Sequence, residues 1–89
     1  MKLLAFSIYD VKVEAFMAPF YARSFGEAER FFGDMQSDKS GPVGRHPQDY
    51  NLFHVGTFDE TTGKLGGLEE FVKVVVESGP PRLEVSDGR

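Results

Sequence analysis

The sequence predicts a small α+β domain, an antiparallel sheet of about four strands with one helix packed on one face. Three observations support this fold class. The 89 residues include nine phenylalanines and three tyrosines, enough aromatic surface for a hydrophobic core. In several segments apolar side chains alternate with period two, as in half-buried strands. In one further segment they recur at three- and four-residue spacing, as in an amphipathic helix. The chain has no cysteine, so neither disulfides nor a thiolate zinc site can support the fold.

Two strands are expected before the helix. Residues 2–10 alternate, with Leu4, Phe6 and Ile8 on one face of a first strand and the intervening side chains on the other. A second strand is expected over residues 15–23. Pro19 has no backbone N–H, so this strand should lie at a sheet edge or be interrupted there, and a plain loop is the alternative.

A helix is expected from Phe25 to about Ser37. Ser24 and Glu27 have the spacing of a capping box, in which the serine oxygen accepts an amide of the first turn and the glutamate returns to the cap. Glycines within the segment weaken the helix, and packing on the sheet must offset that loss. The apolar stripe that would pack there consists of Ala28, Phe31, Phe32 and Met35.

A loop, a third strand and a tight turn are expected next. Residues 37–47 contain two prolines and two glycines, which break any period. Residues 49–59 alternate as a strand, and Gly63 suits the positive φ of a turn over residues 59–64. The connection is expected to continue over residues 65–68. One face of the strand should carry Leu52, His54, Gly56 and Phe58, and the other Phe53, Val55 and Thr57.

The last strand is expected over residues 69–77. Its acidic start would also suit a helix, but three consecutive valines favour a strand. Residues 1–78 should therefore form a single α+β domain. Residues 79–89, which begin with Gly-Pro-Pro, should form a flexible C-terminal tail. The inward face of this strand would carry Val72, Val74 and Val76, with Phe71, Lys73, Val75 and Glu77 opposite.

The charge and the N-terminal sequence limit the classes of function. The net charge is −4, with six Lys/Arg against seven Asp/Glu in residues 1–50 and four against seven in residues 51–89. This balance argues against a strongly basic nucleic-acid coat, although a local basic face can still form. The apolar run at residues 3–6 is too short for a signal peptide or a membrane span, so we expect a cytosolic protein.

Motifs for catalysis or metal binding are lacking. The serines are not in the tight elbow of hydrolases, and the glycines do not form a phosphate-binding loop. His46 and His54 have no third ligand at a metal-like spacing. We therefore expect no catalytic residue, no metal site and no cofactor, and a protein that is not an enzyme.

Aromatic and basic residues occur together on the predicted strands and at their edges. Aromatic rings can stack on unpaired bases while Lys and Arg hold phosphates. Two other uses of the aromatics are open: most could form the core, or the uncovered second face of the sheet could be a dimer interface. The candidate nucleic-acid-binding residues are Lys2, Tyr9, Lys12, Tyr21, Arg23, Arg45, His46, Tyr50, His54 and Lys73.

Several blocks of the chain, over roughly residues 3–78, agree in order and spacing with one family. They are Ile8-Tyr9-Asp10 with Lys12, Glu14-Ala15-Phe16, Ala18-Pro19-Phe20-Tyr21-Ala22, a helix with Ala28, Arg30 and Phe32, and His46-Pro47-x-Asp49-Tyr50-x-Leu52-Phe53-x-x-Gly56-x-Phe58-Asp59-x-x-Thr62-Gly63. These blocks resemble the small nonstructural protein of gokushovirus-type microviruses, the tailless single-stranded DNA phages.

The resemblance implies a phage protein made in the host cytoplasm and absent from the virion. Family members are described as DNA-binding, with a suggested role in the change from duplex replication to single-strand synthesis and packaging, and the family supplies no catalytic residues. We therefore expect a nonenzymatic homodimer that binds single-stranded DNA during viral genome replication and has no membrane association. The alternative is a protein-interaction module that engages the phage replication initiator or a host replication factor through its acidic surface, without direct DNA binding.

Overall fold

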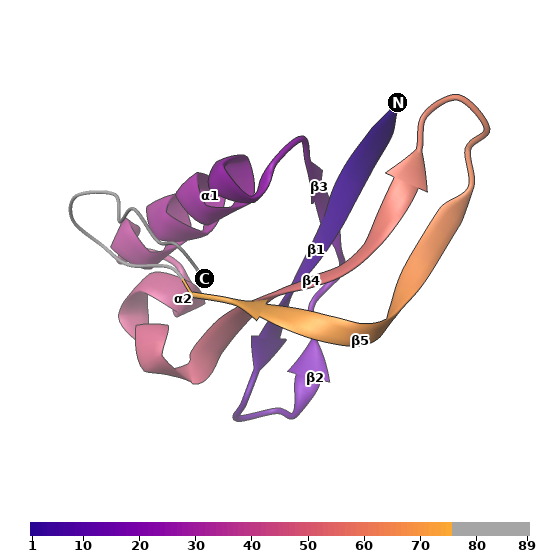
Figure 1. Cartoon of the computed structure of the whole chain (residues 1–89). Helices are drawn as coiled ribbons and strands as arrows, with labels where there is room; N and C mark the ends of the chain where they lie inside the picture. The colour runs from indigo at the N-terminus through magenta and orange to yellow at the C-terminus, as the bar shows by residue number, and fades with distance from the viewer. Residues whose placement is uncertain (76–89) are drawn as a thin grey trace.

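The computed structural model describes residues 1–75, which form mainly antiparallel sheet with one long and one short helix (Figure 1). The broad α+β class is confirmed, although the sheet dominates the fold more than the sequence indicates. The elements are β1 (Lys2–Asp10), β2 (Ala15–Phe16), β3 (Phe20–Ala22), α1 (Phe25–Ser37), α2 (Pro42–Arg45), a 3-10 turn (Pro47–Asp49), β4 (Tyr50–Asp59) and β5 (Leu65–Val74).

β1 is the central strand of the sheet. It pairs antiparallel with β4 along its whole length, and its other edge pairs with β3 near Ala5 and with β2 near Tyr9. β5 pairs with β4 and forms the opposite edge of the order β2-β1-β4-β5. The strand expected over residues 15–23 is therefore two short edge strands separated at Pro19, as its missing N–H predicts.

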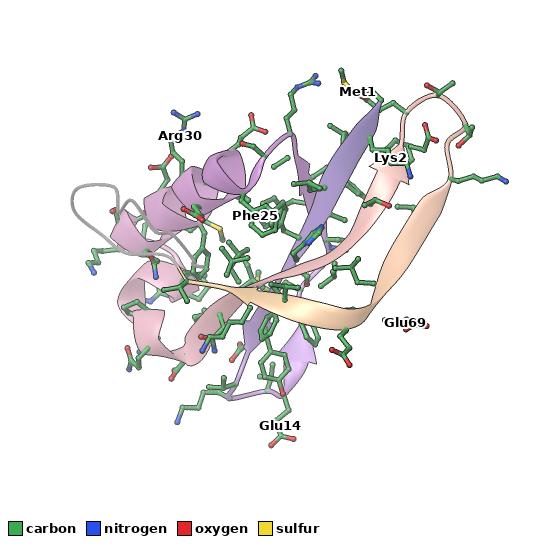
Figure 2. The ribbon with its side chains drawn as sticks, viewed as in Figure 1. Met1, Lys2, Glu14, Phe25, Arg30 and Glu69 are labelled. Carbon is green, nitrogen blue, oxygen red and sulfur yellow. The ribbon has the colours of Figure 1, made fainter. Side chains whose placement is uncertain are left out.

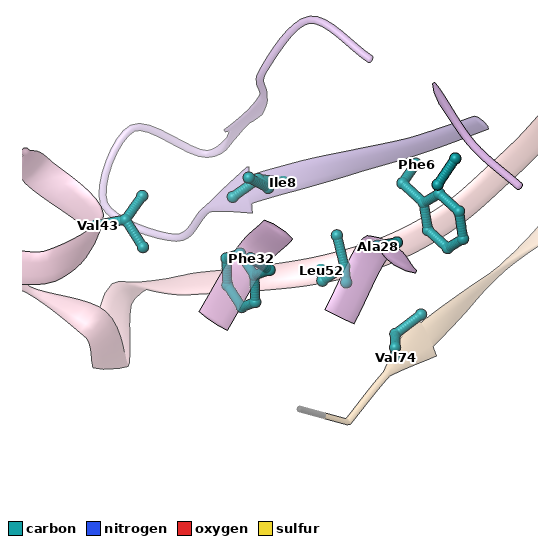
Figure 3. Close-up of a cluster of buried hydrophobic side chains, with 8 residues drawn as sticks. Phe6, Ile8, Ala28, Phe32, Val43, Leu52 and Val74 are labelled. Atoms are coloured by element: carbon teal, nitrogen blue, oxygen red, sulfur yellow. The ribbon is translucent and has the colours of Figure 1, made fainter. Parts of the chain in front are cut away.

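One face of the sheet is covered by α1 and α2 and contains the core (Figure 3). Phe6 from β1 and Leu52 from β4 are its largest fully buried side chains, together with Val43 from α2. The alternation expected in β1 and the helical stripe are confirmed, except that Phe31 stays 48 % exposed. The buried cluster comprises Phe6, Ile8, Ala22, Ala28, Phe32, Val43, Leu52 and Val74.

The start of α1 is capped as expected on one side. The Ser24 hydroxyl oxygen accepts the amide of Glu27 at 3.1 Å, which satisfies one free donor of the first turn. The Glu27 carboxylate accepts the amide of Arg23 at 2.7 Å, one residue before the cap. The helix spans Phe25–Ser37, as the sequence predicts.

Two segments expected as loops contain regular structure. Within residues 37–47, α2 begins at Pro42, whose fixed φ suits a first helical position, and its next residue Val43 reaches the core. Gly44 lies so close to the backbone of Asp38 that a Cβ there would overlap it. Within residues 65–68, β5 begins at Leu65, which pairs with β4 directly after the turn. The turn itself is confirmed, with Gly63 at a φ of 76°.

A β-bulge in β4 reverses part of the expected face assignment. The pairing register shifts between His54 and Gly56, so Val55 is an extra residue in the strand. Side chains beyond the bulge change faces. Gly56 and Phe58 therefore lie on the face of Phe53, and the expectation that they share the face of His54 is wrong.

The last described strand agrees with the expected inward face at Val74, which is buried, while Val72 is about half exposed. Val76, Glu77, the expected domain boundary at residue 78 and the expected tail over residues 79–89 lie outside the described residues. No helix in residues 1–75 is long and apolar enough to cross a membrane.

Candidate nucleic-acid interface

The face of the sheet opposite α1 carries a second set of aromatic side chains, and we call it the aromatic face. Strand pairing assigns residues to it, because directly paired residues point to the same side. Both described helices lie on the other face. The six aromatic residues of the aromatic face are Tyr9, Phe16, Tyr21, Phe53, Phe58 and Phe71.

Four of these rings form one group around Phe16. Its centroid lies 4.8 Å from that of Tyr9, 5.6 Å from that of Phe53 and 5.5 Å from that of Phe71. Phe16 is nevertheless 44 % exposed and Phe71 47 % exposed. These rings therefore support one another while part of each stays open to a ligand. We call this group the first platform.

The contact between Phe16 and Phe71 shows that the sheet is curled toward the aromatic face. Phe16 is on β2 and Phe71 on β5, the two ends of the strand order. In a flat sheet these strands would lie about 14 Å apart, three strand spacings. The bend coincides with an irregularity in which residues 68–71 of β5 lie opposite the single bulged residue of β4, and Figure 1 shows β5 turning there.

A second, smaller group lies nearer the N-terminal end of β1. The rings of Tyr21 and Phe58 are 5.7 Å apart, and Tyr21 is 42 % exposed. Tyr21 pairs with Ala5 and Phe58 with Leu3, which places both rings on the aromatic face. We call this pair the second platform.

The paired positions of the aromatic face carry few charges, although the chain as a whole is acidic. Among the positions that strand pairing assigns to it, Lys73 is the charged one, and it pairs directly with Phe53. Glu69 and Glu70 directly precede Phe71 in the unpaired part of β5, and alternation from Lys73 through Phe71 puts Glu69 on the same side, at the bend of the strand (Figure 2). Among the paired positions of the described strands, the aromatic face therefore carries no carboxylate, and the acidic side chains nearest to Phe71 lie at the bend of β5.

Three of the candidate residues, Tyr9, Tyr21 and Lys73, are brought together on the aromatic face. His54 lies on the opposite face, where its ring centroid is 5.3 Å from that of Phe6 and 5.0 Å from that of Phe25. Its Nε2 lies 3.0 Å from the carbonyl oxygen of Gly56, within hydrogen-bond distance. Phe25 and this histidine thus extend the core under α1.

The remaining candidates are dispersed. Tyr50 pairs with Asp10 and packs against the core, and its pKa is raised by burial and by the Asp10 carboxylate. Arg45 donates from Nη1 to the carbonyl of Ser40 at 2.7 Å and so ties α2 to the preceding loop. The other four are Lys2, next to the β4–β5 turn (Figure 2), Lys12 in the β1–β2 turn, Arg23 before α1, and His46 after α2.

The aromatic face also contains four residues that the candidate set lacks: Phe16, Phe53, Phe58 and Phe71. Alternation along the last strand does put Phe71 beside Lys73. The bulge hides Phe58, because simple alternation assigns it to the other face. Within residues 1–75, no group of three side chains is placed to hold a metal ion.

Residues of the His46-to-Gly63 block have clear structural roles. Leu52 is part of the core, and Gly56 lies against the backbone of β5. The Asp59 side chain accepts the amide of Thr61 at 2.9 Å, and its carbonyl oxygen accepts the amide of Gly63 in the β4–β5 turn. A block of this spacing therefore specifies one strand and the turn that follows it.

Comparison with known proteins gives the family. Residues 3–78 match the family described as Phage ORF5 protein. The chain belongs to this family. It is 26 % identical over 83 residues to Protein ORF5 of Chlamydia phage 1, an alignment that covers 89 % of this chain and 86 % of that protein. Chlamydia phage 1 is a gokushovirus of the Microviridae, so the resemblance to the small nonstructural proteins of these phages is confirmed. No solved structure matches the chain significantly.

Proposed function

We propose that this ORF5-family protein is a nonenzymatic phage protein that binds single-stranded DNA through the aromatic face. It would act in the host cytoplasm, outside the virion, in viral genome replication or in the switch to single-strand synthesis. The observation that carries the proposal is the set of half-exposed rings of Phe16, Phe71 and Tyr21 on a face whose paired positions carry one charge, that of Lys73. Stacking on such rings contributes about 1–3 kcal/mol per base.

The balance of aromatic and basic side chains favours single strands over duplex. Bases in a duplex are already stacked and paired, so exposed rings cannot reach their faces without unstacking them. Duplex binding depends on many phosphate contacts, and a chain of net charge −4 with one lysine on this face is poorly suited to supply them. We expect stacking to dominate, with a log–log salt slope of only about −1, since each neutralised phosphate on a single strand contributes about −0.7.

The test is fluorescence anisotropy of a labelled single-stranded oligonucleotide, with a duplex of equal length, at low and moderate salt. The informative variant is Phe71→Leu, which keeps an apolar side chain but removes the ring. Its matched control is Phe31→Leu, because Phe31 is 48 % exposed, like Phe71, but lies on α1. We expect the first variant to weaken single-strand binding about five- to 150-fold and the second to leave it unchanged.

Two results would contradict the proposal. One is the absence of single-strand binding at low salt. The other is an equal loss of affinity in the Phe71 and Phe31 variants, which would mean that the aromatic face has no special part in binding. Circular dichroism of both variants shows whether either has lost its fold.

The homodimer expected from the sequence is compatible with this function only if the two copies meet away from the aromatic face. A contact through Phe16 and Phe71 would cover the rings that stack on bases. Sedimentation velocity with and without oligonucleotide measures this directly. A dimer that dissociates on adding DNA would place the contact on the aromatic face.

A second candidate function is an interaction with the phage replication initiator or a host replication factor. The observation that favours it is an exposed stripe on α1, where Glu27, Phe31 and Asp34 recur at four- and three-residue spacing. A half-exposed ring between two carboxylates suits a partner with an apolar pocket and a basic rim. Capture of such a replication protein by the wild-type chain but not by Phe31→Leu, without DNA binding, would favour this function.

A further inference from the structure

The two platforms lie along the same strand. Phe16 of the first platform pairs with Tyr9, and Tyr21 of the second platform pairs with Ala5. These positions on β1 are four residues apart, which at about 3.3 Å per residue corresponds to about 13 Å. The exposed rings are therefore held at a fixed separation by the central strand of the sheet.

The floor between the platforms consists of small, neutral residues: Ala5 and Ser7 of β1 and Gly56 of β4. All three are buried, and the Ser7 hydroxyl donates to the carbonyl of Met17 at 2.6 Å, so its hydrogen bond is made within the protein. No carboxylate is assigned to this floor by the pairing of the described strands. Because these residues are buried, a ligand that spans the two platforms would contact the larger side chains beside them, and the pairing of β1 places no carboxylate between the platforms.

We propose that one DNA strand runs along β1 and stacks a base on each platform, so that the smallest full site is about five nucleotides per protomer. The separation of about 13 Å is close to four steps of roughly 3.4 Å per nucleotide along a strand, and two bases four steps apart are the ends of a run of five. This inference rests on the proposed function, because it requires that single-stranded DNA binds the aromatic face. Once one base is stacked, the second contact becomes intramolecular, and affinity increases by far more than a doubling of sites.

The first test is the length dependence of binding by the full chain. Labelled oligothymidylates of two, four, eight and twelve nucleotides are titrated by anisotropy at low salt. We expect a steep gain in affinity between four and eight nucleotides and only a small gain, set by the number of available registers, between eight and twelve. Binding of the twelve-nucleotide strand without this step would overturn the inference and leave the proposed function standing. No binding of that strand would overturn both.

The second test removes one platform at a time with Tyr21→Leu and Phe71→Leu. Each should weaken binding of the eight-nucleotide strand about five- to 150-fold. Each should change binding of the two-nucleotide strand by no more than about twofold, because the other platform still takes the base. Tyr21→Phe, which keeps the ring, should restore binding, and an intact circular dichroism spectrum shows that the variants fold. If Tyr21→Leu leaves the affinity for the eight-nucleotide strand unchanged, the second platform takes no part in binding and the inference is wrong.

Discussion

Replacing Gly56 with alanine tests the account of the β4 bulge most directly. A Cβ at this position would lie 3.3 Å from both the carbonyl carbon of Gly66 and the Cα of Gly67, and closer still to the carbonyl oxygen of Gly66. All three atoms belong to the backbone of β5, which is paired with β4 here. They cannot rotate away as a side chain could. Because carbon atoms pack best at about 3.5–4.0 Å, the two strands must separate to admit the methyl group.

The expected loss of stability follows from that separation. Overpacking of this kind costs about 1–3 kcal/mol, and a weakened ladder hydrogen bond adds about 1 kcal/mol. We therefore expect Gly56→Ala to lower the free energy of unfolding by about 2–4 kcal/mol. In a domain of this size each kcal/mol shifts Tm by about 4–8 °C, so the variant should melt roughly 10–30 °C lower.

Thermal unfolding followed by circular dichroism measures the shift, with Gly66→Ala as the matched control. Gly66 lies on the adjacent strand, but a Cβ there meets only the Thr57 hydroxyl at 3.6 Å, an ordinary contact. The control should unfold at or slightly above the wild-type Tm, because glycine weakens a strand. A Gly56→Ala protein that melts within about 4 °C of the wild type would refute the close approach of the strands.

Three further changes have defined outcomes. Gly33→Ala should raise the free energy of unfolding in urea by up to about 1 kcal/mol, because Gly33 is inside α1 and a Cβ there has nothing within 4 Å. Ser24→Ala should lower it by about 1 kcal/mol through loss of the cap, and an unchanged urea midpoint would contradict that role. Hydrogen bonds led by the Thr61 amide hold the pKa of Asp59 below its ordinary value of 3.8. The ionised carboxylate therefore stabilises the fold above that value, and this stabilisation is lost as pH falls through the folded pKa. The difference in free energy of unfolding between wild type and Asp59→Asn should therefore narrow only below about pH 4.

Local chemistry in the sequence determines several elements of this protein. The Ser24 cap, the missing N–H of Pro19 and the positive φ of Gly63 act within a few residues of chain, and each one places a helix start, a strand break or a turn as observed. The alternation of β1 likewise needs only period two, since Phe6 and Ile8 are buried in the core and Leu4 is partly buried against it, on the side expected. The family likeness also follows from such short blocks.

The tertiary structure decides the features that depend on contacts between distant residues. The bulge at Val55 arises from the pairing of β4 with two neighbours at once, and it changes the face of Phe58. α2 is a helix rather than loop because Val43 can reach a core built by other segments. The first platform exists because the sheet curls enough for Phe16 and Phe71, 55 residues apart in sequence, to touch across its two ends. No local pattern encodes that curvature, because it is a property of several strands paired together.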